Sequence, residues 1–230
     1  MSEPVLEVIA CSVADAIEAR DGGANRLEVV SDFEQGGLTP SFELVSAINE
    51  TVKLPLRVML RDSVGYAVHG DEEIETLSAA AEQFAKLGVD GLVVGFLKGD
   101  RVDIELTERV VARAPDLRIT FHHAFEGAGD QLQAVPDIKS ISRVDKILSS
   151  GGSGELTQRC ERLARYAEAA APEVAIIAGG GIDGAVISML KRTTTIREFH
   201  VGRAARSGFC VDGDVQAELV NNMVRLLRES

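Results

Sequence analysis

Eight short apolar runs, rich in β-branched residues, recur along the 230 residues of the chain, and this recurrence constrains the fold more than any other feature. Segments with helical periodicity separate the runs, as where Ile74, Leu77 and Ala81 follow one another at steps of three and four. Continuous apolar runs are typical of strands buried on both faces, as in parallel sheets. The predicted strands are 5–10, 26–30, 56–60, 91–95, 118–121, 146–149, 174–178 and 197–201.

The number and spacing of these units predict a (β/α)₈ TIM barrel, an α/β fold that needs roughly 200–250 residues. An open doubly wound sheet is the alternative, but no G-x-G-x-x-G sequence follows the first predicted strand. No linker, low-complexity tract or block of charge divides the chain. We therefore expect a single TIM-barrel domain over residues 1–230.

Composition excludes several classes of protein. The 24 Lys and Arg against 36 Asp and Glu give a net charge of −12, which argues against a nucleic-acid partner. No apolar run is long enough for a membrane span, and the start Met1-Ser2-Glu3-Pro4 does not resemble a signal peptide. The three cysteines are scattered, without a C-x-x-C pair, so a disulfide framework and structural zinc are not supported. We expect a cytoplasmic protein; a homo-oligomer stays open.

Polar residues gather where the predicted strands end, which is the end of a TIM barrel that carries the active site. Following the strands in order, these residues include Glu7, Glu28, Arg61, His122 and His200. We predict that they form a catalytic group.

Glu7 and Glu28 stand inside apolar strands, in the matching strings Leu-Glu-Val. A buried carboxylate needs a charged or hydrogen-bonding partner, or else its pKa is raised, and we expect Arg61 and His122 to be the partners of these two. One interpretation is a general acid/base pair; the other is a structural ion-pair network that fills the barrel.

His122 and His123 are adjacent at one strand end, so one ring should point into the barrel and the other outward. We predict that His122 is the inward one, because it shares a face with Thr120. The two glutamates with His122 and His200 could also bind a divalent metal, as in sugar isomerases. No compact ligand motif supports that alternative, and the cofactor is unknown from the residues alone.

Glycine-rich segments follow the last three predicted strands and predict an anion site. Glycines allow close approach of the backbone to a ligand, and the loops after strands seven and eight commonly bind phosphate in this fold. The anion would be a small-molecule ligand. The predicted anion-binding residues are Ser150, Gly151, Gly180, Gly181, Gly202 and Arg203.

Several strings resemble the copper homeostasis protein CutC family, and the similarity runs over essentially the whole chain. This resemblance implies a cytoplasmic (β/α)₈ barrel that is linked to copper tolerance and proposed to bind Cu(I). It also implies a copper ion as ligand, and Glu7, Glu28, Arg61, His122 and His200 match the family's pattern. The strings are Leu6-Glu7-Val8, Arg26-Leu27-Glu28, Glu34-Gln35-Gly36-Gly37-Leu38-Thr39-Pro40-Ser41, Thr120-Phe121-His122, Gly179-Gly180-Gly181-Ile182 and Glu198-Phe199-His200.

The chain departs from the family where copper ligands are expected. Family members commonly carry cysteines at the positions of Ile9 and Val30, and Cu(I) prefers thiolate or thioether ligands. Cys11 is the thiol that remains near the predicted barrel mouth, as a weak candidate metal ligand.

Taken over the whole chain, the resemblance favours a copper homeostasis protein. The alternative is an isomerase, epimerase or lyase acting by acid/base chemistry on a small anionic or phosphorylated sugar-like metabolite.

Overall fold

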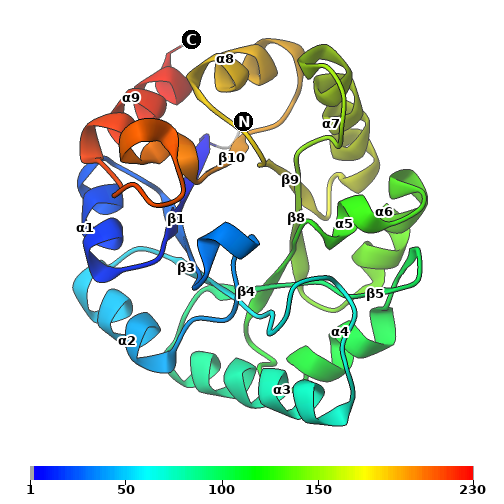
Figure 1. Cartoon of the computed structure of the whole chain (residues 1–230). Coiled ribbons are helices and arrows are strands. Elements are labelled where there is room, and N and C mark those ends of the chain that lie inside the picture. Colours follow the sequence, from blue (N-terminus) through cyan, green and yellow to red (C-terminus); the bar gives the residue numbers. More distant parts are fainter. Residues whose placement is uncertain (1–2, 230) are drawn as a thin grey trace.

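The computed structural model describes residues 3–229, which form a closed barrel of eight parallel strands surrounded by helices (Figure 1). Around the barrel the strands follow the order β1-β10-β9-β8-β7-β4-β3-β2. The predicted TIM barrel is confirmed.

The elements agree with the predicted strands to within two residues at each end. The barrel strands are β1 (Val5–Ala10), β2 (Arg26–Val29), β3 (Leu56–Met59), β4 (Gly91–Val94), β7 (Arg118–Phe121), β8 (Val144–Ser149), β9 (Ala175–Ala178) and β10 (Glu198–Val201). The helices are α1 (Val13–Asp21), α2 (Phe42–Thr51), α3 (Asp71–Lys86), α4 (Ile104–Val111), α5 (Ala124–Gly127), α6 (Gln131–Ser140), α7 (Leu156–Ala170), α8 (Gly184–Thr193) and α9 (Ala217–Arg228). A short hairpin, β5 (Leu97–Lys98) and β6 (Arg101–Val102), was not predicted.

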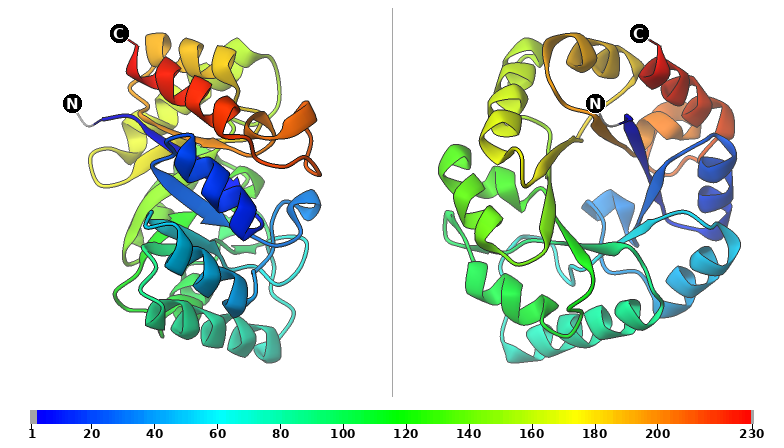
Figure 2. Two further views of the ribbon diagram at one scale, coloured as in Figure 1. Left: turned by 90° about the vertical axis from the view of Figure 1, so that its left-hand side faces the viewer. Right: turned by 180° about the vertical axis from the view of Figure 1, so that it is seen from behind.

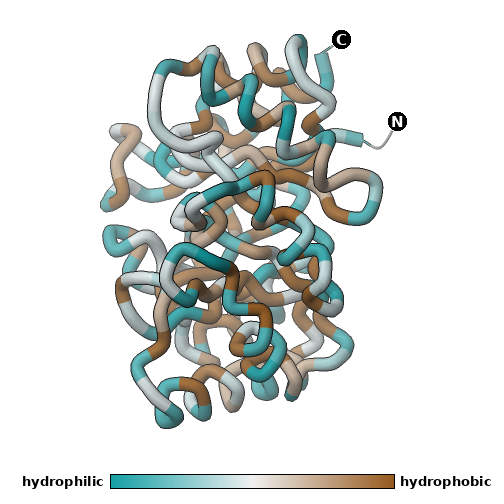
Figure 3. The backbone as a smooth tube through the Cα atoms, turned by 90° about the vertical axis from the view of Figure 1, so that its right-hand side faces the viewer, coloured by the Kyte–Doolittle hydropathy of each residue, from teal (hydrophilic) through white to brown (hydrophobic). Residues whose placement is uncertain are grey.

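Alternate residues of each strand face the helices or the barrel interior. In β1, Leu6 and Val8 belong to the main core between strands and helices, whereas Ile9 belongs to a second small cluster with Val30, Met59 and Val93. Hydrophobic and hydrophilic segments alternate along the chain accordingly (Figure 3). Each strand thus packs one apolar face against the helices and turns its other face toward the barrel interior.

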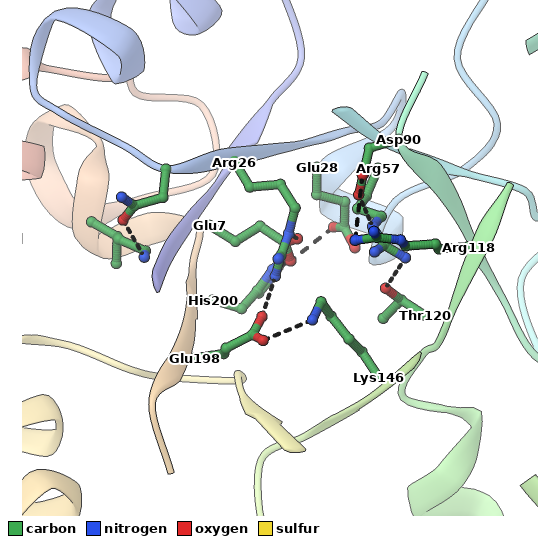
Figure 4. Close-up of polar contacts among 12 residues, drawn as sticks. Glu7, Arg26, Glu28, Arg57, Asp90, Arg118, Thr120, Lys146, Glu198 and His200 are labelled. Atoms are coloured by element: carbon green, nitrogen blue, oxygen red, sulfur yellow. Dashed lines mark hydrogen bonds and ion pairs between the residues drawn. The ribbon is translucent and has the colours of Figure 1, made fainter. Parts of the chain in front are cut away.

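Charged side chains occupy much of that interior. Arg57 of β3 is completely buried; its guanidinium donates to both oxygens of Asp145, at 2.9 and 2.8 Å, and to Asp90 at 2.8 Å. Nearby, Arg26, Glu198 and Lys146 form a second set of ion pairs (Figure 4). Because a buried charge is costly without a partner, these pairs fix which face of each strand points inward.

The loops that follow the strands gather at one end of the barrel. The 3-10 turn η1 (Phe33–Gln35) and the segment with η2 (Arg203–Ala205) and η3 (Ser207–Phe209) project from this end, and the N-terminus lies toward the other (Figure 2). Between residues 3 and 229 there is no helix with the length and apolar character that crossing a bilayer would require.

The close contact of β4 with β7 gives a test of the barrel packing. A Cβ at Gly91 would lie 2.3 Å from the carbonyl oxygen of Arg118, a backbone atom that cannot turn away. We expect Gly91→Ala to lower the free energy of unfolding by about 1–3 kcal/mol, measured by chemical denaturation. The control Val64→Ala, at a side chain 65% exposed, should change it by less than about 0.5 kcal/mol. Equal effects of the two substitutions would contradict this packing.

Candidate functional site

A cavity of about 500 Å³ opens at the end of the barrel where the strands terminate. Strands β2, β3 and β10 and the loops after β2, β7, β9 and β10 all contribute to its wall. Its polar wall contains Glu28, His122 and His200, and its apolar wall contains Ile9 and Met59. The position is the one predicted for an active site in this fold.

Glu7 lies beneath this cavity and does not line it. One carboxylate oxygen accepts a hydrogen bond from Arg26 Nε, and the other lies 2.8 Å from His200 Nδ1. Burial alone would raise the pKa of Glu7, but the charge of Arg26 and the contacts with His200 outweigh it and hold the pKa well below its usual range. Glu7 is therefore a fixed anion. For this residue the structure matches the ion-pair interpretation.

Glu28 is in a different situation, although it is equally buried. Its Oε1 has no hydrogen-bond partner among the described residues 3–229, and its Oε2 lies 3.7 Å from His200 Nε2. Burial raises the pKa of Glu28, the positive charge of His200 lowers it, and the charge of Glu7 adds to the rise. Glu28 thus combines a raised pKa with an unsatisfied carboxyl oxygen, a combination suited to exchanging a proton with a bound molecule.

The two buried histidines have opposite surroundings. For His122, burial and the charge of Arg61 lower the pKa to about 3, so the ring is neutral. The Ala124 N–H donates to His122 Nδ1 at 3.2 Å, which leaves the ring proton on Nε2. That Nε2–H finds no acceptor within the part of the chain that the structure describes. For His200, burial alone would lower the pKa, but the carboxylates of Glu28 and Glu7 raise it overall.

The predicted pairing of Arg61 and His122 with the two glutamates is wrong. Arg26 and His200 are the partners of Glu7, and His200 is the neighbour of Glu28. Arg61 instead donates to backbone carbonyls, at 3.0 Å to Ser63 and at 3.3–3.4 Å to residues 35–37. Its guanidinium therefore holds the loop after β2 and brings a positive charge to the cavity wall.

The predicted anion-binding residues divide into two groups. Gly180, Gly181, Gly202 and Arg203 line the cavity. Ser150 and Gly151 do not, and their N–H groups already donate within the chain, respectively to Glu126 Oε1 and, at 3.0 Å, to Ser149 Oγ.

Glu126 is a cavity residue that the sequence reasoning missed. Its Oε1 also accepts from Ser149 Oγ at 3.0 Å, and its Oε2 lies 3.5 Å from His123 Nδ1. Burial would raise its pKa, but the contacts with His123 and Ser150 lower it to about 2. Its position three residues after His123, in the turn after β7, is the signal that could have revealed it. Of the two adjacent histidines His122 is the buried one, as predicted, and the half-buried His123 also lines the cavity.

Three potential metal ligands, from Glu7, Glu28 and His200, have ligand atoms within 4.8 Å of one another. Both oxygens of Glu7 and the Nδ1 of His200 already take part in hydrogen bonds, so Glu28 and His200 Nε2 are the two ligands of this group that a metal could bind without competing with these bonds. Two ligands are fewer than the three protein ligands of a typical catalytic metal site. The arrangement therefore fits proton transfer better than a resident metal.

Comparisons with known proteins identify the family. The model of the CutC family matches residues 5–205 of the chain. This chain belongs to the CutC family. A relative described as family protein CutC in Xanthomonas campestris pv. campestris (strain 8004) is 34% identical over 196 residues, which are 85% of this chain and 81% of the relative. The copper homeostasis protein cutC homolog of Homo sapiens is 31% identical, over 85% of this chain and 72% of its own.

Solved structures agree with the assignment to the CutC fold. The copper homeostasis protein CutC from Streptococcus agalactiae superimposes with a TM-score of 0.80 at 23% identity, covering 86% of this chain and 98% of its own. Phosphoribosyl anthranilate isomerase from Thermococcus kodakaraensis has a TM-score of 0.67 at 14% identity, covering 99% of this chain and 100% of its own. At these identities both similarities show the fold alone.

The neutral state of His122 can be tested by acid titration. The pKa of a histidine in an unfolded chain is about 6.5, so only the unfolded chain binds this proton between that pH and about 3. The free energy of unfolding therefore contains the full contribution of the neutral His122 above about pH 6.5. This contribution is lost as the pH falls from about 6.5 toward about 3. We expect the ring C2–H signal of His122, assigned with His122→Gln, to stay constant in NMR spectra from pH 8 to 4.

The free energy of unfolding gives an independent check. Between pH 7 and 4 it should fall less in His122→Gln than in the wild type, by about 3 kcal/mol at most. A C2–H titration midpoint between pH 5 and 7, or the same acid loss in both proteins, would contradict a neutral His122.

Proposed function

We propose that this chain acts in copper homeostasis, the role in the name of its human relative, and that its working site is the polar cavity at the barrel mouth. The family match over residues 5–205 supports the copper role. The observation that supports the cavity is a pair of complementary buried atoms that have no hydrogen-bond partner among residues 3–229. Glu28 Oε1 can accept a hydrogen bond and His122 Nε2–H can donate one, and both residues line this cavity.

The cysteines do not offer a Cu(I) site. Cu(I) prefers thiolates, but burial raises the pKa of Cys11 to about 11, and the nearby charge of Arg206 only partly offsets this. Its Sγ lies 3.4 Å from Arg206 Nη2 and is not part of the cavity wall. Cys160 is buried on α7, and Cys210 is exposed on the segment after β10. We infer that the chain contributes to copper homeostasis through a small molecule bound in the cavity.

Complementation of copper tolerance tests this proposal. In a host that lacks its own CutC protein, we expect the wild type and Cys11→Ala to restore growth on copper. Glu28→Gln should fail, because it removes the carboxyl proton and charge while keeping the shape of the side chain. Immunoblots and thermal unfolding should show equal amounts of folded protein for all three.

A Cu(I) competition assay is the matched control. The purified wild type and Cys11→Ala should take up equally little Cu(I) from its bicinchoninate complex. Growth that depends on Cys11 but not on Glu28 would mean that a thiol site, and not the cavity, carries the copper function. Failure of the wild type to restore tolerance would contradict the copper role.

A second candidate function is proton transfer next to a carbonyl in a small anionic or phosphorylated metabolite. The neutral His122 favours it, since an uncharged Nε2–H in the same cavity as a glutamate base is suited to polarise a carbonyl during enolisation. Gly180, Gly181 and Arg203 at the cavity wall would bind the anionic group. This function is an isomerase, epimerase or lyase type of chemistry, and it is compatible with an indirect effect on copper.

Inorganic phosphate is a suitable probe of the anion subsite. In amide NMR spectra, added phosphate should shift the signals of Gly180, Gly181 and Gly202, which line the cavity. The signals of Ser150 and Gly151 should stay unchanged, since their N–H groups donate within the chain. Arg203→Gln should weaken binding about tenfold, because it removes one charged hydrogen-bond donor. The subsite is refuted if phosphate shifts none of the three glycines, or shifts Ser150 equally.

A further inference from the structure

The ion pairs beneath the cavity extend to His200 through Glu7. Arg26 donates through Nε to Glu7 and through Nη2 to Glu198, at 2.8 Å, and Glu198 also accepts from Lys146 at 2.7 Å (Figure 4). Arg26 is 6% exposed and Glu7 1% exposed, so solvent screens these contacts little. Arg26 is thus the cation that compensates the buried charge of Glu7.

Glu7 in turn determines how His200 can hold its proton. As an ionised carboxylate, its Oε1 can only accept a hydrogen bond, and it lies 2.8 Å from His200 Nδ1. The Nδ1 therefore keeps its proton in both the neutral and the cationic ring. The Nε2, which lies 3.7 Å from Glu28 at the cavity wall, is the nitrogen that gains or loses a proton.

We propose that Arg26 is a positioning residue for this site: by holding Glu7 as a carboxylate it fixes a His200 proton on Nδ1 and leaves Nε2 directed toward Glu28 and the cavity. A bound molecule then exchanges its proton with Glu28 and His200 Nε2, whereas Glu7 and Arg26 never contact it. Carboxylate–histidine pairs that select one ring tautomer are common in catalytic sites. The inference rests on the proposed use of the cavity.

Arg26 differs from Arg57 in its partners, although Lys146 links the two sets of ion pairs through Glu198 and Asp145. Arg57 is equally buried, but its partners are Asp90, Asp145 and Thr120, and the structure gives it no contact with Glu7 or His200 among residues 3–229. Arg57 therefore offers a matched control: its loss removes a buried cation from the same barrel without changing the partner of Glu7.

Long-range ¹H–¹⁵N NMR spectra of the histidine rings test the proposal directly, because they distinguish a protonated from an unprotonated ring nitrogen. In the wild type, at a pH where the ring of His200 is neutral, we expect Nδ1 to be protonated and Nε2 to be free. Arg26→Lys and Arg57→Met should keep this signature. In Arg26→Met, Glu7 is left buried without its cation, so the pair should hold an extra proton and the neutral Nδ1–H form should be lost.

Two results would overturn the proposal. A neutral Nε2–H ring in the wild type would refute it even if no variant folds, and loss of the signature in Arg57→Met to the same extent as in Arg26→Met would reduce Arg26 to a general packing role. The spectra read the proton of the ring and require no ligand or turnover. They can therefore refute the role of Arg26 while the cavity remains the working site. They can equally support that role when no copper phenotype is found.

Discussion

The ion pairs inside the barrel are the constraint on which the rest of this structure depends. A typical TIM barrel is filled with branched apolar side chains, whereas here several strands contribute an inward charge at the same depth. Arg26 of β2 lies between Glu7 of β1 and Glu198 of β10. A slip of one residue in β2 would turn Arg26 toward the apolar core and leave Glu7 buried without its cation, while Glu198 would keep only Lys146. The charges thus specify the strand register as well as filling the space.

The same strands also bear residues of the candidate site, at positions nearer to the loops. In β2, Glu28 lies two residues after Arg26, and in β10, His200 lies two residues after Glu198. Residues two apart in a strand share a face, so each ion-paired residue supports a cavity residue directly above it. Among residues 3–229, the buried side-chain nitrogens and oxygens of Arg26, Glu7 and Arg57 have hydrogen-bond partners, whereas Glu28 Oε1 and His122 Nε2 have none. The paired layer supplies rigidity, and the unpaired atoms supply the capacity to bind.

The sequence was sufficient to predict the barrel and the need of Glu7 and Glu28 for partners, but not the partners themselves. Periodicity indicates which face a residue occupies, and it does not indicate how deep in the barrel a long side chain reaches. Arg26 begins its strand and reaches Glu7, whereas Arg61 lies just beyond β3 and turns to loop carbonyls. The same limit applies to the loop after β8, where a glycine-rich string predicted an anion site but the Ser150 N–H donates to Glu126. Such local competition between acceptors appears only once the chain is folded.

Environment, rather than residue type, assigns the roles of the buried histidines. His122 has a backbone donor on one nitrogen and the charge of Arg61 nearby, so it remains a neutral donor. His200 lies between two carboxylates, so it retains a proton more readily. A neutral donor and a proton-retaining ring in one cavity are complementary, as required for polarising one oxygen while moving a proton at the neighbouring atom. Soft copper ligands would serve neither purpose, and Cys11 instead packs beside Arg206, outside the cavity. The proposed link between this barrel and copper is therefore a small molecule bound in the cavity.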